Sequence, residues 1–275
     1  MLSSSRYNQT LNTTVETYLK AVVEIARDVL EEEFVGAYAA GSLALNAFHP
    51  GRSDIDIALV CRDPLSEVVK QDLIARLRHR CLPCPARGLE LVVYTLATAQ
   101  SGTPDPGFEL ELNDGPSMDF RQSFHPTDRP IADGTFWYGL DRSTLHQSGR
   151  VLAGPAASEV FAELSPDDER SLLIDSLQWW MALPGLGSDH PTAGAEDAVL
   201  GTCRALVRHR YRRWLSKVDA GHRLLQAGYQ PDELIAQSIA ARSGGPPPSG
   251  LQARAFQNKV LNEILTTSTT HVPLH

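Results

Sequence analysis

The sequence predicts an α+β fold with two domains, an N-terminal α/β domain with a mixed sheet and a C-terminal all-helical domain. Two observations carry this prediction. Short apolar or alternating runs bounded by glycine and proline, which are typical of strands, occur only in the first half. From residue 165 onward the apolar residues recur at helical spacing. We therefore place the domain boundary near Leu164 and expect domains at 1–164 and 165–275.

Helices and strands are expected to alternate at the start of the chain. Apolar residues at helical spacing predict helices over 14–33 and 65–80. Strands are predicted at 34–40, 54–60 and 88–94, where the apolar side chains alternate or run together. The first half thus has the pattern of an α/β domain.

The middle of the chain is less regular. Residues 100–116 are rich in Gly, Pro and acids and predict a loop with an edge strand at 108–112. Residues 135–148 and 151–164 are expected to be helical or mixed. Ser165-Pro166 has the form of a helix start, with Ser as the N-cap and Pro in the first turn. Further helices are predicted at 172–183, 196–215, 220–228, 231–242 and 252–265.

Composition limits the classes of partner. The chain has 275 residues, a formal charge of −8 and a pI near 5.6, which argues against general affinity for nucleic acid or anionic membranes and suits a cationic small molecule. The arginines of 204–214 are spread around their helix, so we expect a solvated helix and not a nucleic-acid stripe. With no long apolar run, a polar N-terminus and four cysteines, we expect a cytoplasmic monomer.

Three acids and a turn carry the chemistry. Asp54 and Asp56 are one strand repeat apart and point to the same side, and Glu90 lies on the next predicted strand. Like charges so close favour a metal ion between them, and Mg²⁺ prefers few carboxylates together with phosphate oxygens. Backbone N–H groups and the hydroxyl at Gly41-Ser42 could hold a phosphate. The alternative is that these acids are only solvated strand residues.

The order of Gly41-Ser42, Asp54-Ile55-Asp56 and a later strand acid resembles the nucleotidyltransferase superfamily of the polymerase β type. Three features of the second half narrow the resemblance to the streptomycin and spectinomycin adenylyltransferases. They are residues 151–155, the tryptophans Trp179 and Trp180, and residues 197–204. The resemblance covers about residues 21–226. It implies an N-terminal nucleotidyltransferase domain and a helical domain that binds substrate and nucleotide.

Site roles follow from the resemblance, position by position. It implies that Asp54 and Asp56 bind magnesium and that Glu90 is the catalytic base. Gly41, Ser42 and Ser53 would contact phosphate. The implied cofactors are ATP and Mg²⁺.

The resemblance also assigns residues in the helical half. Arg204 and Lys217 would bind the ATP phosphates, although a lone lysine is often only a surface residue. Trp180, or its neighbour Trp179, and Asp189 would contact the acceptor. Adjacent helical residues point about 100° apart, so we expect one of the two tryptophans to be core. Glu109, Glu111 and Asp114 are further candidates for binding a cationic acceptor.

The function implied is an ATP-dependent O-adenylyltransferase acting on an aminoglycoside or aminocyclitol antibiotic, with streptomycin or spectinomycin as acceptor. Two alternatives remain open. The same reaction on another hydroxylated small molecule is compatible with the long Gly- and Pro-rich segment 183–194. The other alternative is a nucleotide-binding protein without turnover, such as an antitoxin of this fold, although those usually lack a long helical domain.

Overall fold

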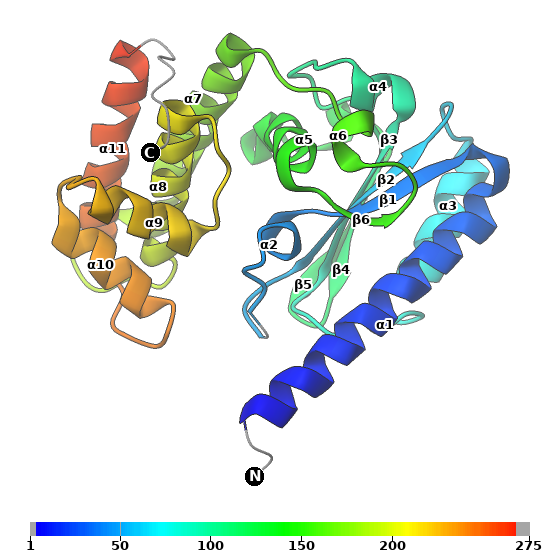
Figure 1. The fold of residues 1–275 in the computed structure, drawn as a ribbon, viewed down its shortest axis with the longest axis horizontal. Coiled ribbons are helices and arrows are strands. Elements are labelled where there is room, and N and C mark those ends of the chain that lie inside the picture. Colours follow the sequence, from blue (N-terminus) through cyan, green and yellow to red (C-terminus); the bar gives the residue numbers. More distant parts are fainter. Residues whose placement is uncertain (1–3, 50, 268–275) are drawn as a thin grey trace. The chain divides into compact units, whose positions relative to one another are not determined.

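The computed structural model describes residues 4–49 and 51–267. The chain divides into two compact units, Met1–Leu164 and Ser165–His275. Strands occur in the first unit, and the second is built from helices (Figure 1). The α+β fold class predicted from the sequence is therefore confirmed.

A six-stranded sheet forms the centre of the first unit, in the order β5-β4-β3-β2-β1-β6. Its strands are β1 (Phe34–Ala39), β2 (Ile55–Cys61), β3 (Leu89–Thr95), β4 (Phe108–Gly115), β5 (Met118–Ser123) and β6 (Arg150–Ala153). Strands β2 and β3 are parallel, and the other neighbouring pairs are antiparallel. The sheet is thus mixed, as predicted.

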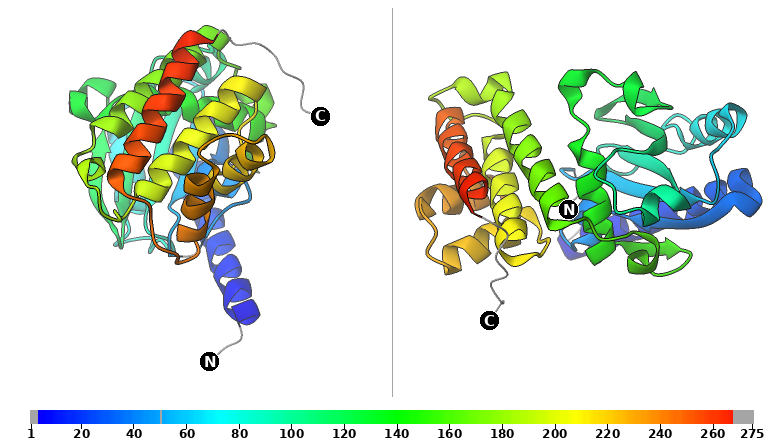
Figure 2. Two further views of the ribbon diagram at one scale, coloured as in Figure 1. Left: turned by 90° about the vertical axis from the view of Figure 1, so that its left-hand side faces the viewer. Right: turned by 90° about the horizontal axis from the view of Figure 1, so that it is seen from above.

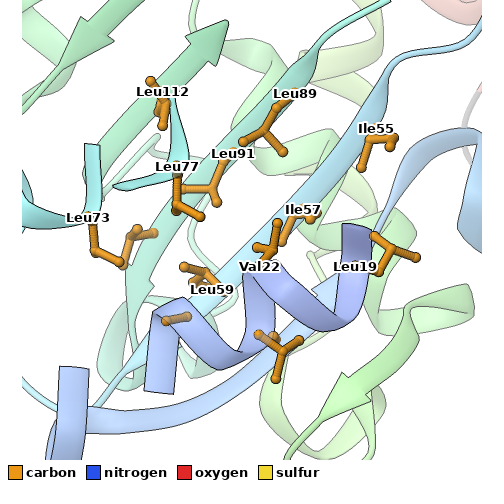
Figure 3. Packing of buried hydrophobic residues seen from close by; sticks show 14 of the residues in the cluster. Leu19, Val22, Ile55, Ile57, Leu59, Leu73, Leu77, Leu89, Leu91 and Leu112 are labelled. Atoms are coloured by element: carbon orange, nitrogen blue, oxygen red, sulfur yellow. The ribbon is translucent and has the colours of Figure 1, made fainter. Parts of the chain in front are cut away.

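Helices α1 (Ser4–Leu30) and α3 (Glu67–Leu77) cover one face of this sheet. Their apolar stripes pack on alternate residues of the strands, which produces one continuous core (Figure 3). The fully buried members of this core include Val22, Ile55, Leu59, Leu73, Leu77, Leu89 and Leu91. The intervening strand residues therefore point to the opposite face.

On that opposite face, the ends of the strands are covered by α5 (Phe136–Ser148) and α6 (Ala157–Val160). Tyr38, Tyr94 and Phe161 are buried there with edge-to-face ring contacts. The short helices α2 (Gly41–Ala44) and α4 (Leu96–Gln100) follow β1 and β3. This second core ends where Asp56 and Glu90 begin the polar part of the face.

The second unit contains α7 (Pro166–Ala182), α8 (Ala195–Tyr211), α9 (Lys217–Gln226), α10 (Asp232–Ala241) and α11 (Gly250–Thr266). Helix α8 is central and packs against the other four (Figure 2). As predicted, Ser165 caps α7, since its hydroxyl accepts the backbone N–H of Asp168 at 3.1 Å. No helix in the described ranges is long and apolar enough to span a membrane.

One expectation about the middle of the chain is wrong. The strand at 108–112 is not an edge strand, because β4 is bonded to both β3 and β5. Residues 151–164, expected to be helical or mixed, are mixed, since strand β6 is followed by the short helix α6. Both edge strands escape sequence analysis, because β5 is mostly polar and exposed and β6 has only four residues.

Candidate functional site

A glycine turn lies against the first carboxylate of the sheet. Strand β1 ends at Ala39, and Gly41 adopts a φ of +51°, which favours glycine. A Cβ atom built on Gly41 would overlap the Asp56 carboxylate, so the turn approaches that side chain as closely as a glycine allows. The Ala40 N–H also donates to the Asp56 carbonyl at 2.9 Å. The backbone thus brings Gly41 and Asp56 together.

Ser42 follows in this turn and is half-buried. Its Oγ atom is buried and has no hydrogen-bond partner among the described residues. Since buried hydroxyl groups normally form hydrogen bonds, this oxygen is available to a bound group beside Asp56. A phosphate oxygen or a metal-bound water has the required chemistry.

The three predicted acids converge at the start of two parallel strands. Asp54 lies directly before β2, and Asp56 is the register partner of Glu90 on β3. The pKa of Glu90 is raised well above its usual value. The largest cause is that surrounding protein atoms displace water from the carboxylate, and the negative charges of Asp56, Asp54 and Asp141 add to this effect. The Glu90 side chain is nevertheless exposed to solvent. A carboxyl group with a raised pKa is suited to accept a proton near neutral pH.

The donors present suit a Mg²⁺ ion, although the described residues contain no cluster of three or more His, Cys, Asp or Glu side chains arranged to hold a metal. Mg²⁺ usually takes only one or two carboxylates and completes its shell with water and substrate phosphates. Asp54 and Asp56 supply such a pair. The neighbouring Ser42 hydroxyl is consistent with the same hard-oxygen chemistry.

Ser53 and Arg87 border these acids. Ser53 is buried, and its Oγ atom accepts the backbone N–H of His49 at 3.0 Å, which closes the loop before β2. The Nε atom of Arg87 lies 3.9 Å from Asp54 Oδ1. Ser53 therefore has a structural role in shaping this loop, in addition to the phosphate contact expected from the resemblance.

One acid of this site was missed by the sequence analysis. Asp141 lies on α5, and its charge is among those that raise the pKa of Glu90. Nothing in the local sequence of α5 marks Asp141, because only the packing of α5 on the sheet brings it near the strand acids.

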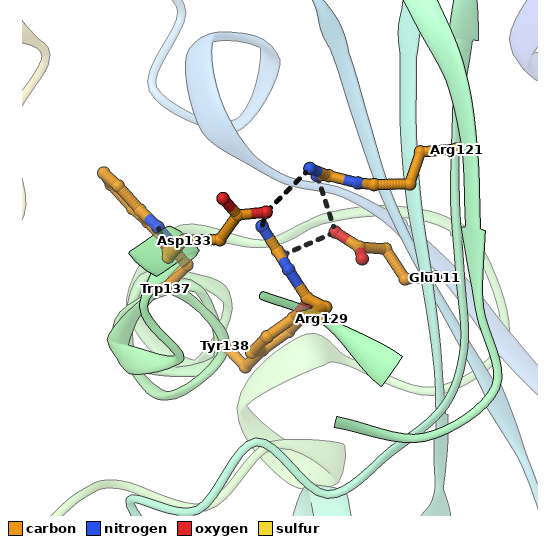
Figure 4. A network of polar contacts seen from close by, with 6 residues as sticks. All are labelled: Glu111, Arg121, Arg129, Asp133, Trp137 and Tyr138. Atoms are coloured by element: carbon orange, nitrogen blue, oxygen red, sulfur yellow. Dashed lines mark hydrogen bonds and ion pairs between the residues drawn. The ribbon is translucent and has the colours of Figure 1, made fainter. Parts of the chain in front are cut away.

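A partly buried charge network lies farther along the same face of the sheet (Figure 4). Glu111 Oε1 accepts from Arg129 at 2.8 Å and from Arg121 at 3.3 Å, and both arginines also contact Asp133. The hydroxyl of Tyr138 bonds Arg129 as well. Two arginines thus balance two acids in this network.

The acids considered for binding a cationic acceptor already have cationic partners within the protein. Glu109 pairs with Lys70 at 2.9 Å, and Asp114 pairs with Arg78 at 3.0 Å. Glu111 belongs to the network described above. These ion pairs account for the three acids as parts of the fold.

In the helical unit, Lys217 begins α9 and pairs with Asp197 on α8, with Nζ 3.1 Å from Oδ1. Arg242 contacts the same Oδ1 atom. Burial and the charges of Arg204 and Arg242 lower the pKa of Lys217, against the effect of Asp197. Arg204 also lies over the Trp214 ring, 5.9 Å from its centroid. The structure thus brings Arg204 and Lys217 near each other, as their predicted roles require.

The predicted acceptor residues lie near the end of α7 and in the segment that follows. Trp179 and Trp180 contact each other edge to face, with their centroids 5.4 Å apart. Both are half-buried, so the expectation that one of them is core is wrong. Asp189 is exposed and lies 3.4 Å from His190 Nε2. It belongs to the segment between α7 and α8.

The arginine-rich part of α8 is not solvated as expected. Arg208 is 3% exposed and pairs with the buried Glu169 at 2.8 Å. Arg212 bonds the same carboxylate, and Arg210 pairs with Glu263. These arginines hold α7, α8 and α11 together, so three of the five have a structural role.

No known family model matches the sequence, and no curated protein matches it. The structure is similar to the crystal structure of the spectinomycin adenyltransferase AAD(9) from Enterococcus faecialis, solved with ATP and spectinomycin. The match has a TM-score of 0.63 and 16% sequence identity, and it covers 91% of this chain and 99% of the other. The protein therefore shares the fold of this spectinomycin adenyltransferase over most of its length.

Proposed function

We propose that this protein is a Mg²⁺-dependent O-adenylyltransferase. It moves AMP from ATP to a hydroxyl group of an aminoglycoside or aminocyclitol antibiotic, with streptomycin or spectinomycin as acceptor, and so gives resistance. The observation that carries this proposal is the register of the parallel strands, which pairs Asp56 with Glu90 beside the Gly41 turn. A metal-binding carboxylate and a basic carboxylate are both needed within reach of one phosphate.

The shared fold supports the choice of nucleotide and of acceptor class. The spectinomycin adenyltransferase that the chain resembles was solved with ATP and spectinomycin. At 16% identity the likeness extends to the fold, so the identity of the acceptor must be tested with a panel of antibiotics.

The residues that would bind the triphosphate are assigned from the resemblance. Asp54 and Asp56 would hold Mg²⁺, which when bound neutralises charge on the phosphates. The Gly41 backbone and the Ser42 and Ser53 hydroxyl groups are assigned to phosphate oxygens. Arg204 and Lys217 are likewise assigned to the phosphates, whose negative charge they would offset. Neutralisation is needed because the negative phosphates otherwise repel an incoming hydroxyl oxygen.

Glu90 is the proposed general base. Its carboxylate takes the proton of the acceptor hydroxyl as the oxygen forms a bond to the α-phosphorus. The bond from this phosphorus to the oxygen bridging to the β-phosphate breaks, and pyrophosphate leaves. A positioned base contributes about 10²- to 10⁴-fold to such a step. The raised pKa of Glu90 makes its carboxylate a stronger base than an ordinary glutamate.

Trp179 or Trp180 and the exposed Asp189 are assigned to the acceptor. Both indole rings have accessible surface, and an aromatic face attracts a cationic group. A carboxylate such as Asp189 binds guanidinium or ammonium groups through charge-assisted hydrogen bonds. These are the groups that distinguish an aminoglycoside from an uncharged sugar.

The test is pyrophosphate release from ATP and Mg²⁺ with streptomycin, spectinomycin, kanamycin, hygromycin or no acceptor. Glu90→Gln is the matched inactive control. Release with streptomycin or spectinomycin, absent without acceptor and absent in the variant, is the expected result. Release with none of the four, while ATP still binds, would refute the antibiotic as acceptor and leave another hydroxylated molecule. Failure to bind ATP would refute the proposal entirely.

A further inference from the structure

Three helices of the second unit meet where two cations contact one carboxylate. Asp197 lies in the first turn of α8, Lys217 begins α9 and Arg242 follows the last residue of α10. Both cations contact the same Asp197 Oδ1 atom. Arg204 is seven residues after Asp197, two turns along the same face of α8.

The side chains at this carboxylate are accessible but not freely solvated. The exposed fractions are 28% for Lys217, 18% for Arg242 and 24% for Asp197. Charged groups held in this way interact more strongly than fully exposed ones, because less water screens them. The contacts of Asp197 also fix where the two cations lie.

The position of Lys217 in its helix is unfavourable without an anion. It is the first residue of α9, where the helix dipole is positive and a cation is destabilised. The neighbouring charges of Arg204 and Arg242 act in the same direction on its pKa. Asp197 offsets part of this cost, and with Lys217, Arg204 and Arg242 around one carboxylate the cluster can still attract a further negative group.

We propose that Arg242 is a third polyphosphate-binding cation beside Lys217 and Arg204, and that Asp197 positions Lys217 and Arg242 for this contact. The inference rests on the proposed function, since it adds a residue to the proposed nucleotide site. The guanidinium group provides several N–H donors in a fixed plane, so it can bond Asp197 through one nitrogen and a phosphate oxygen through another.

The direct test measures binding of inorganic tripolyphosphate and of ATP by calorimetry, without acceptor. Arg242→Ala should weaken both by about 10- to 100-fold, as expected for loss of a hydrogen bond between charged groups. Arg213→Ala is the matched control, because it removes an exposed arginine of the same unit. Arg242→Lys keeps the charge and should restore part of the affinity. Equal affinities for Arg242→Ala and Arg213→Ala would overturn the role of Arg242.

The sign of a second variant tests the positioning role. Asp197→Asn removes a negative charge, so electrostatics alone would tighten tripolyphosphate binding. Loss of positioning has the opposite effect, and we expect weaker binding of tripolyphosphate and a higher KM for ATP, with the KM for acceptor unchanged. Asp197→Glu should restore much of the affinity. Tighter binding by Asp197→Asn would overturn the positioning role.

A loss of affinity must be distinguished from a loss of folding. Thermal unfolding of each variant shows whether a loss of affinity reflects a damaged unit, and Arg242→Lys decides the matter if Arg242→Ala unfolds early. If the wild type binds tripolyphosphate and ATP but transfers AMP to no acceptor, the acceptor proposal fails and Arg242 is still tested. If the wild type binds neither, both proposals are overturned.

Discussion

Two glutamates on neighbouring strands have opposite surroundings. Glu90 on β3 and Glu111 on β4 point to the same face of the sheet. Glu90 and Val92 are two residues apart on β3 and therefore share a face, and Val92 is the register partner of Glu111. Glu111 is buried between two arginines. Glu90 is exposed, and the nearby charges that raise its pKa are those of acids.

The difference separates a structural carboxylate from a functional one. The charge of Glu111 is balanced within the fold, so it stabilises the packing of β4 against the loop before α5 and requires no ligand. Carboxylates crowded as they are around Glu90 cost free energy in the folded state. Such a cost is typical of functional sites, where a bound group of opposite charge offsets it.

The largest expected effect is that of Glu90→Gln on transfer. Loss of the base should lower the rate of AMP transfer by about 10²- to 10⁴-fold, with ATP binding nearly unchanged. Transfer is measured by pyrophosphate release and binding by calorimetry. A rate within a few-fold of wild type would show that Glu90 is not the base.

The same variant should not reduce stability. Because the folded pKa of Glu90 lies above its unfolded value, the folded protein holds the proton to higher pH, and stability falls as the pH rises through that interval. Above it, where Glu90 is charged in both states, glutamine removes the cost. Glu90→Gln should therefore unfold at the wild-type temperature or higher at pH 8 in EDTA, and a lower temperature would contradict this account.

Glu111→Gln should have the converse effect. It leaves Arg129, whose side chain is 8% exposed, without its closest carboxylate. Breaking a buried ion pair from one side costs about 3–5 kcal/mol, which denaturant titration can measure. Glu16→Gln is the control, because the Glu16–Arg150 pair is on the surface and should contribute about 1 kcal/mol or less. Equal losses in the two variants would show that the network is no more stabilising than a surface pair.

Asp54→Asn tests the metal directly. It should weaken Mg²⁺-dependent ATP binding by at least about tenfold. Loss of a residue that only bonds a metal ligand already lowers metal affinity by about 10- to 100-fold, and loss of a direct ligand should lower it at least as much. In EDTA the variant and the wild type should bind ATP alike. Asp119→Asn, which changes an exposed acid of β5, should behave as wild type in both conditions. Unchanged Mg²⁺-dependent binding in Asp54→Asn would remove Asp54 from the metal site.

Much of the fold follows from local patterns in the sequence. Alternation at Ile55, Ile57 and Leu59 gives both the strand and the face on which Asp54 and Asp56 lie. Asp141 and Arg242 could not be identified in this way, because they reach their partners only through packing of helices distant in sequence. The register between β2 and β3 is also tertiary information, and it is what pairs Asp56 with Glu90.

The smallest expected effect is that of Arg121→Gln. Comparing it with Arg129→Gln tests whether the buried arginine of the Glu111 network contributes more to stability than the exposed one. Arg121 is 40% exposed, whereas Arg129 is 8% exposed, although both contact Glu111 and Asp133. Water can replace much of what Arg121 provides, so its removal should cost about 1 kcal/mol or less. Arg129→Gln leaves the buried Glu111 with only the more exposed Arg121 as a cationic partner and should cost several times more. Denaturant titration of both variants checks the ratio. Equal costs would mean that Glu111 depends on both arginines alike, and that burial does not decide which charges the fold requires.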